Sequence, residues 1–249
     1  MSARRRHGGR NALLLVAALF ALWQAMYWAV GDTALSSPLA TLRYTAHLVT
    51  GEDFRMHLFD TMRAFTIAFV LSVVIGLLVG FWLGFDRLSG DALEPMIVTV
   101  YAIPKLTLYP ILLLAFGLGL SAKVAFGVLH GTIPIILFTL GAVRNTKPIL
   151  LKTGHVLKLS RPQMVRWILF PAAIPEIFTG LRVGFSLTLI GSLLAEMFAS
   201  QRGLGYLLMN GIGLHNIELV MSVTLLIVVF AASVSTLLLH IDRRLHRQD

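Results

Sequence analysis

The residues most able to do chemistry in this sequence are a few polar and charged side chains inside long apolar stretches. Lys105 and Thr107 lie between the two prolines of YAIPKLTLYP, His130 lies midway along another stretch, and Glu196 ends a third. A charge inside a bilayer costs roughly 2.5–3.5 kcal/mol on insertion scales, so it usually faces a cavity or a partner. The predicted lining of a path or gate is Lys105, Thr107, His130, Ser186, Ser192 and Glu196.

Each of these candidates also has a purely structural interpretation. Lys105 can snorkel to an interface or neutralise a packed acid, and hydroxyls such as those of Ser186 and Ser192 commonly hydrogen-bond across helices. Glu196 can line a gate or cap a neighbouring helix. Arg182, near the predicted inner end of a span, is more simply an interfacial anchor. The residue types alone leave both interpretations open.

The sequence predicts that the chain is not an enzyme. It has no cysteine, and its one close cluster of acids with a histidine, Glu52, Asp53 and His57, falls in a predicted exposed loop. No G-x-x-x-x-G-K-[ST] loop is present to cradle a nucleotide phosphate. The residues therefore predict no catalytic site, no metal site and no cofactor in this chain.

The composition indicates a membrane protein. Hydrophobic residues make up 57% of the 249 residues, only 13% are charged, and the mean hydropathy is +0.80. The average soluble domain is about 45–50% apolar. The formal net charge of +9 gathers at the chain ends and in one loop, without interleaved aromatic residues. It therefore indicates membrane orientation and no nucleic-acid partner.

Six apolar stretches are long enough to cross the roughly 30 Å core of a bilayer as helices. The first, Leu13–Val30, exceeds the usual apolar run of a signal peptide, about 7–15 residues, and is interpreted as a retained anchor. The predicted fold class is an all-α integral membrane protein of one domain, with residues 1–30 as the anchor and about 62–240 as the core. The other five stretches are 62–85, 95–117, 124–143, 177–198 and 219–240.

The distribution of Lys and Arg predicts the orientation. The connection between the fourth and fifth stretches, Arg144 to Arg166, carries six basic residues and no acid. In a chain of six spans this connection shares a face with both termini, where the other basic residues lie, and the positive-inside rule makes that face cytoplasmic. These terminal residues are Arg4, Arg5, Arg6, Arg10, Arg243, Arg244 and Arg247.

Three connections are predicted on the opposite face. They are a loop over 31–59, a tight turn near 119–122, and a glycine-rich segment over 200–216. The last alternates glycines with large apolar residues, which favours a short interfacial or re-entrant helix over an aqueous loop.

The basic inner segment of about 150–175 has two interpretations. A basic, partly amphipathic helix on the surface can lie in a groove of a partner protein. The same charges can instead bind anionic lipid headgroups. The residues do not separate these interpretations.

Four segments together resemble the permease subunits of bacterial ABC importers, in the nitrate, sulfonate and taurine branch. They are YAIPKLTLYPILLLAFGLG, the loop that ends in ILFPAAIPEIFTGLR, AEMF, and GLGYLL, and the resemblance covers about 62–249. It implies a permease subunit of an ATP-driven importer in the bacterial inner membrane. The rival class is a secondary transporter or channel that does not depend on ATP.

The resemblance also implies a coupling helix in the inner loop, between spans four and five. Such permeases share E-A-A-x-x-x-G, nine residues, then I-x-L-P, and counting back from Pro171 aligns Ile168 with the isoleucine and Lys158 with the glycine. Lys152 stands at the glutamate, which predicts an ATPase groove of different charge or weaker coupling. The predicted coupling residues, within a helix from Lys152 to Arg161, are Lys152, Thr153, Gly154, Lys158, Leu159, Ser160 and Arg161.

The partners implied by the resemblance follow from this class of transporter. They are a pair of ABC ATPase subunits that hold the ATP and Mg²⁺, an extracytoplasmic solute-binding protein, and a second permease copy in a homodimer. Membrane lipid surrounds the chain.

Overall fold

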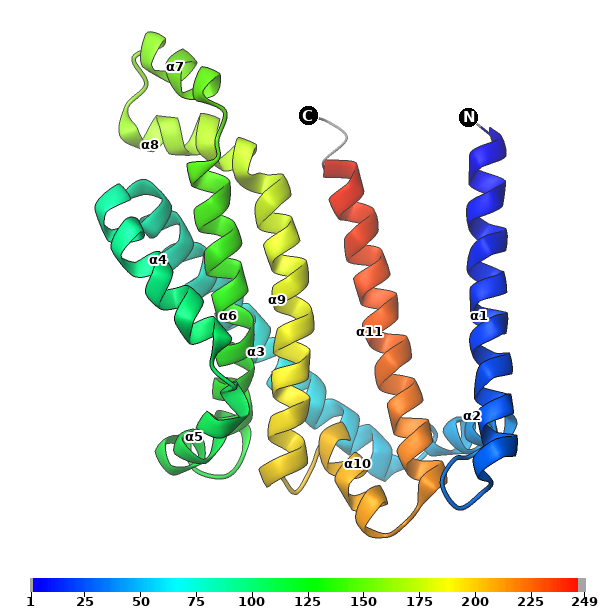
Figure 1. Cartoon of the computed structure of the whole chain (residues 1–249). Helices are drawn as coiled ribbons and strands as arrows, with labels where there is room; N and C mark the ends of the chain where they lie inside the picture. Colours follow the sequence, from blue (N-terminus) through cyan, green and yellow to red (C-terminus); the bar gives the residue numbers. More distant parts are fainter. Residues whose placement is uncertain (1, 246–249) are drawn as a thin grey trace.

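The computed structural model describes residues 2–245, without the side chains of residues 2–13, 161, 244 and 245. The predicted topogenic charges Arg4, Arg5, Arg6, Arg10, Arg244 and Arg247 therefore lie outside the described side chains. The described part is helical and contains no strand (Figure 1). Its elements are α1 Ser2–Val30, α2 Pro38–Leu48, α3 Glu52–Phe85, α4 Arg87–Ala102, η1 Lys105–Leu108, α5 Tyr109–Phe116, α6 Leu120–Arg144, α7 Pro148–Val156, α8 Arg161–Met164, η2 Val165–Leu169, α9 Phe170–Ala199, α10 Leu204–Gly213 and α11 Ile217–Leu245.

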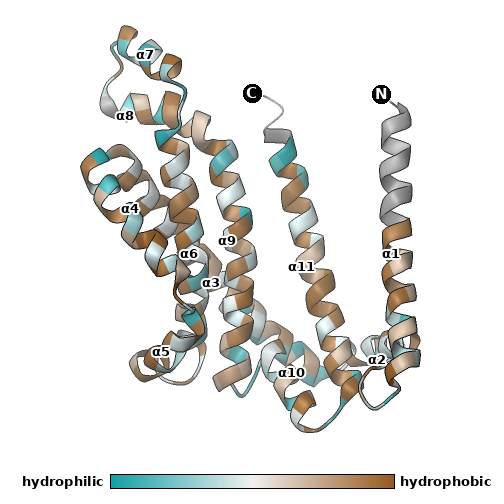
Figure 2. Cartoon of the chain, viewed as in Figure 1, coloured by the Kyte–Doolittle hydropathy of each residue, from teal (hydrophilic) through white to brown (hydrophobic). Residues whose placement is uncertain are grey.

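Four helical segments in the described part are long and apolar enough to cross a membrane: α3, α6, α8 through α9, and α11. A fifth crossing results if α4 and the segment Lys105–Phe116 form one broken span. The apolar part of α1, Leu14–Val30, is shorter. Figure 2 shows α11 brown along its middle and teal near its C-terminal end. The multi-spanning, all-helical class is confirmed, and the count of six remains a prediction.

The centre of the fold is a three-helix contact of α3, α6 and α9. Gly76 of α3 and Gly184 of α9 both lie against Ile135 of α6, where an added methyl group would come within 2.6 Å of the Ile135 side chain. Small residues let helix backbones approach closely in a bilayer, where dispersion contacts must replace the hydrophobic effect. Ile135 is fully buried as a result.

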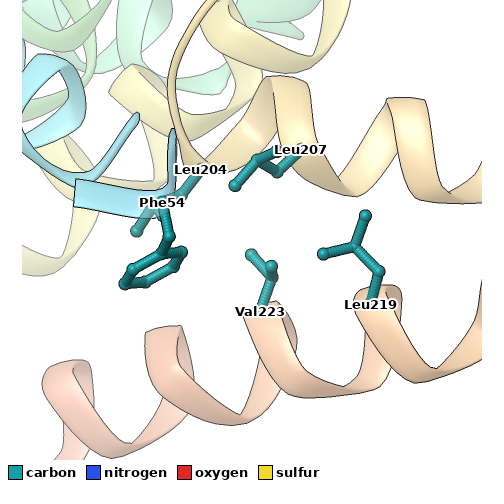
Figure 3. Packing of buried hydrophobic residues seen from close by; sticks show 5 residues of the cluster. All are labelled: Phe54, Leu204, Leu207, Leu219 and Val223. Carbon is teal, nitrogen blue, oxygen red and sulfur yellow. The ribbon is translucent and has the colours of Figure 1, made fainter. Parts of the chain in front are cut away.

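A second layer joins α10 and α11 to the start of α3. Phe54, Leu204, Leu207, Leu219 and Val223 form an apolar cluster there, with side chains from the three helices pointing toward one another (Figure 3). The helix α1 stands apart from this layer (Figure 1), and the indole N–H of Trp23 donates to the Ser36 carbonyl at 3.0 Å.

The third predicted span is broken. The chain bends by 89° between α4 and the segment Lys105–Phe116. The break falls at Ile103 and Pro104, because a proline disfavours helical backbone at the residue before it. Pro110 does not interrupt a helix: it lies in the first turn of α5, where its missing N–H leaves no bond unmade.

The predicted outer loop over 31–59 is largely helical, so the loop prediction is wrong. The Ser37 hydroxyl caps α2 by accepting from the Ala40 N–H at 3.2 Å, with Pro38 as the first helical residue. The cluster expected in an exposed loop lies in the first turns of α3, where Glu52 and Asp53 favourably face the positive end of the helix dipole. The predicted turn near 119–122 ends earlier, because α6 begins at Leu120.

The elements separate into two ends. The segment α7–α8 lies at the upper end of Figure 1, together with the start of α1 and the end of α11. The helices α2, α5 and α10 lie at the opposite end. The short helix predicted in the glycine-rich segment is confirmed as α10, Leu204–Gly213.

Candidate functional site

The carboxylate of Glu196 is the centre of a buried polar network at the α10 end of the molecule. Glu196 lies in the last turn of α9 and is fully buried. Its Oε2 accepts from the Thr61 hydroxyl at 2.7 Å and from the Gly205 N–H at 3.1 Å. Its Oε1 lies 3.4 Å from the ammonium of Lys123, whose side chain is 6% exposed. The network therefore joins α3, α6, α9 and α10.

Lys123 balances the charge of Glu196 and also binds the chain beyond α9. Its ammonium donates to the Arg202 carbonyl at 2.7 Å, a shorter contact than the one to Glu196. A buried charge is tolerated when its partner and hydrogen bonds replace water. The sequence interpretation missed Lys123 because its acid lies in another span. The available signal was a lysine at the predicted outer start of one span and an acid at the outer end of the next.

The turn from α9 into α10 is fixed by α3 side chains. The N–H of Gly203 donates to Nδ1 of His57 at 3.0 Å, and the N–H of Leu204 donates to the Thr61 hydroxyl at 2.8 Å. Because its Nδ1 accepts, a neutral His57 carries its proton on Nε2. Gly203 has a φ of 122°, which favours glycine. The motif GLGYLL thus begins with a residue that this turn requires.

Glu196 makes the contact that is expected of a residue capping the start of α10. The Gly205 N–H is one of the orphan donors in the first turn of α10, and the carboxylate satisfies it. The predicted role of Glu196 in a gate stays a prediction.

The other predicted path residues do not converge with Glu196. The ammonium of Lys105 lies at the α4–α5 bend, donates to the Tyr101 carbonyl at 3.0 Å and lies 4.6 Å from the Tyr101 ring centroid. The exposed Thr107 hydroxyl donates to the Pro104 carbonyl at 2.7 Å. Both side chains therefore find their hydrogen-bond acceptors within the bend itself.

His130 and Ser192 lie in the α6–α9 contact. Nδ1 of His130 lies 2.9 Å from the Phe126 carbonyl, and its ring packs against Phe126 and Gly191. Ser192 is fully buried, and its hydroxyl has no hydrogen-bond partner among the described residues. The structure places these two near each other across the helices, because Gly191 lies against His130 and Gly127 lies against Ser192.

Ser186 lines a separate groove between α4, α9 and α11. The groove has a volume of about 480 Å³, and Tyr101, Ser235 and Thr236 also line it. Arg182, predicted as an interfacial anchor, lies in the same groove and pairs with Asp242 of α11 at 3.5 Å. Of the predicted path residues, Ser186 lines this groove, together with the guanidinium of Arg182 and the hydroxyls of Ser235 and Thr236.

The inner loop contains a helix with bounds that differ from the prediction. The predicted helix, Lys152 to Arg161, is wrong in its second half, because α7 ends at Val156 and α8 begins at Arg161. Lys158 has a φ of 49° and ends α7: its N–H bonds the His155 carbonyl and the Leu159 N–H bonds the Gly154 carbonyl, both at 3.0 Å. This pair of bonds is a Schellman cap.

The α7 surface combines exposed apolar and basic side chains. Val156 is 80% and Leu157 62% exposed, and Lys152 and Lys158 are exposed beside them. Gly154 is buried against Met164, which lets α7 pack on α8. The exposed face of α7 is therefore free of contacts within the described chain.

Arg144, counted above among unopposed basic residues, has acidic partners. Its guanidinium pairs with Asp91 and Glu94 of α4 at 2.8 Å each. Both acids come just before the predicted third span, which begins at residue 95, so counting charges within the loop that begins at Arg144 could not find them. Arg144 fastens α4 to the end of α6.

The sequence matches a known protein family over most of its length. The family of the binding-protein-dependent transport system inner membrane component matches residues 72–247. The chain belongs to this family. Most of the network's helices, α6, α9 and α10, and the whole α7–α8 segment lie within the matched residues.

The curated relatives of this permease are transport permeases. The putative aliphatic sulfonates transport permease protein SsuC of Bacillus subtilis is 25% identical over 83% of this chain and 76% of its own length. A probable ABC transporter permease protein of Haemophilus influenzae is 29% identical over 94% and 95%. The nitrate import permease protein NrtB of Synechocystis is 28% identical over 77% and 72%. These relatives confirm the predicted nitrate, sulfonate and taurine branch, with the taurine transport permease TauC of Escherichia coli also similar.

Solved structures support the fold of the permease. The MetNI methionine ABC transporter in inward-facing conformations contains a chain with a TM-score of 0.62 at 19% identity, covering 75% of this permease and 93% of that chain. A chain of an amino acid ABC transporter with histidines has a TM-score of 0.63 at 17% identity, covering 83% of this permease and 97% of that chain.

The backbone conformation of Lys158 can be compared with the motif that the sequence resembles. Lys158 stands where the resembled motif has glycine, and its left-handed conformation is the one that glycine adopts without strain. Lys158 therefore adopts, with some strain, a backbone conformation that glycine adopts freely. In the described part of the chain, no group of three His, Cys, Asp or Glu residues is placed to hold a metal ion.

Proposed function

We propose that this chain is the membrane subunit of an ATP-driven importer whose inner α7–α8 segment docks an ABC ATPase. Two permease copies, two ATPases that bind ATP and Mg²⁺, and an extracytoplasmic binding protein make up the transporter in the bacterial inner membrane. The observation that carries the proposal is the family match over residues 72–247, which includes the whole α7–α8 segment.

The exposed face of α7 supports ATPase docking. Its outermost side chains, Val156 and Leu157, are apolar and mostly in solvent, as expected of residues that a partner groove covers. Lys152 and Lys158 flank them and add positive charge. A basic docking helix fits an ATPase groove that carries acidic side chains, in contrast to the groove expected for the usual motif.

The proposed topology has six crossings, with both termini and α7–α8 in the cytoplasm. The start of α1, the end of α11 and α7–α8 lie at one end in Figure 1, which is compatible with an even number of crossings. The excess of Lys and Arg in the segment from Arg144 to Arg166 favours the cytoplasm for that end. The first crossing in this scheme is α1.

The named relatives differ in the solutes that they carry, which include sulfonates, nitrate and taurine. We therefore place solute selection mainly in the binding protein. The groove that contains Arg182 and Ser186 is the proposed contact of this chain with the passing solute, because it combines a cation with hydroxyls between helices.

Reconstitution tests the proposed class. Proteoliposomes with the permease, its ATPase and its binding protein should accumulate solute only with ATP, and a non-hydrolysable ATP analogue serves as the control. Uptake by the permease alone, driven by an ion gradient, would show a secondary transporter and refute the proposal.

Co-purification tests the docking surface. Reversing Lys152, Lys158 and Arg161 to Glu together should remove the ATPase from the purified complex, because like charges then face the acidic groove. Arg43→Glu, on an exposed part of α2 at the opposite end, is the matched control. An ATPase that stays bound to the triple variant would show that α7 docks differently or not at all.

A further inference from the structure

A pocket of about 520 Å³ opens at the outer end, above the buried ion pair of Lys123 and Glu196. It lies between α3, the turn into α6 and the turn from α9 into α10. Lys123 contributes to its floor, and Asp60, Arg63 and Arg202 are charged residues of its wall.

The pocket carries an excess of positive charge at its rim. Glu196 balances Lys123 from below. Arg63 and Arg202 are exposed, and within residues 2–245 neither has a carboxylate within 4.0 Å in an ion pair. Asp60 is the one acid in the wall. The rim thus has two guanidinium groups available to bind a carboxylate.

The wall of the pocket is fixed before any partner arrives. The Ser200 hydroxyl donates to the Arg202 carbonyl and accepts from the Arg202 N–H, and Lys123 donates to the same carbonyl. The neighbouring Gly203 N–H is held by His57. A preformed turn reduces the ordering cost of binding.

We infer that this pocket receives an acidic side chain of the extracytoplasmic binding protein, with Arg63 and Arg202 as its ligands. A free small anion is the less suitable occupant, because small-ligand sites bury most of the ligand and these arginines are exposed. When the carboxylate belongs to a docked protein, that protein shields the contact from solvent. Exposed charges at the rim of such an interface mainly steer the approach of the partner. The inference rests on the proposed function, which supplies the partner.

The test uses the full-length permease in nanodiscs of neutral phosphatidylcholine and the peptide acetyl-tetraglutamate-amide as the acidic probe. Binding should weaken with salt, and Arg63→Gln with Arg202→Gln should lower the affinity roughly tenfold. Arg43→Gln, which removes an exposed arginine of α2 at the same end, should change it less than about twofold. Acetyl-tetraglutamine-amide controls for the peptide backbone.

Three results would overturn the inference: no binding of the acidic peptide, equal losses in the paired variant and in Arg43→Gln, or arginine-dependent binding of sulfate without binding of the peptide. The last would show a site for free anions. The peptide-binding assay contains no ATPase and no solute gradient, so its result does not depend on transport. A failure of ATP-driven uptake in proteoliposomes would refute the proposed function without changing the measured peptide affinity. Unchanged melting and gel-filtration behaviour of the paired variant confirms its fold.

Discussion

Removing the ammonium of Lys123 should destabilise the permease more than removing the charge of its partner. Lys123→Met leaves the Glu196 carboxylate fully buried without a cation. Breaking a buried ion pair from one side costs about 3–5 kcal/mol. Glu196→Gln keeps an acceptor for Thr61 and Gly205, and it leaves Lys123 with the Arg202 carbonyl and the pocket. We therefore expect Glu196→Gln to lower the free energy of unfolding by roughly half as much as Lys123→Met does.

The measurement is thermal unfolding of the purified permease in detergent at a fixed scan rate, because membrane proteins often unfold irreversibly. For a chain of this size, 1 kcal/mol corresponds to about 2–4 °C, so Lys123→Met should lower Tm by roughly 6–20 °C. The variant Lys123→Met with Glu196→Gln should recover much of this loss, because it removes both charges together. A double variant whose loss equals the sum of the single losses would refute the coupling of the two groups.

Three further changes test other contacts. Lys158→Gly should relieve the left-handed strain at the end of α7, by about 1 kcal/mol, and slow amide hydrogen exchange there; unchanged exchange would contradict the cap. Gly184→Ala should press on Ile135 and lower Tm, whereas Gly213→Ala, in open space, should not; equal effects would argue against the close contact. Arg144→Gln should lower the stability by less than about 2 kcal/mol, since the Asp91 and Glu94 side chains are 65% and 40% exposed and water screens the pairs; a larger loss of Tm would contradict this.

Local sequence signals predicted the features that depend on local chemistry. The apolar stretches predicted the long helices and the glycine-rich stretch predicted α10, and the observed bend lies at Pro104, the first of the two prolines in YAIPKLTLYP. Each depends on residues that are near in sequence, where helical propensity and proline sterics act.

The network at Glu196 could not be predicted in the same way. Its cation lies 73 residues away and its hydroxyl partner Thr61 lies 135 residues away. No local pattern encodes such distances, because the helix packing that closes them depends on small residues such as Gly184 and on partners elsewhere. The polar start of α3 was missed for a related reason: it resembles a solvated loop until α10 packs on His57 and Thr61.

The buried hydroxyl of Thr61 has a mechanical consequence. Its proton is donated to Glu196 and its oxygen accepts from the Leu204 N–H, so this one hydroxyl links α3 to both α9 and α10. A movement of α9 at this end therefore acts on α3 and α10 through that hydroxyl. The helix α9 has 30 residues and extends for roughly 45 Å from the π-helical turn η2 beside α8. Over this length, a tilt of α9 by roughly 5° about its α8 end displaces its other end, beside the pocket that Lys123 lines, by about 4 Å.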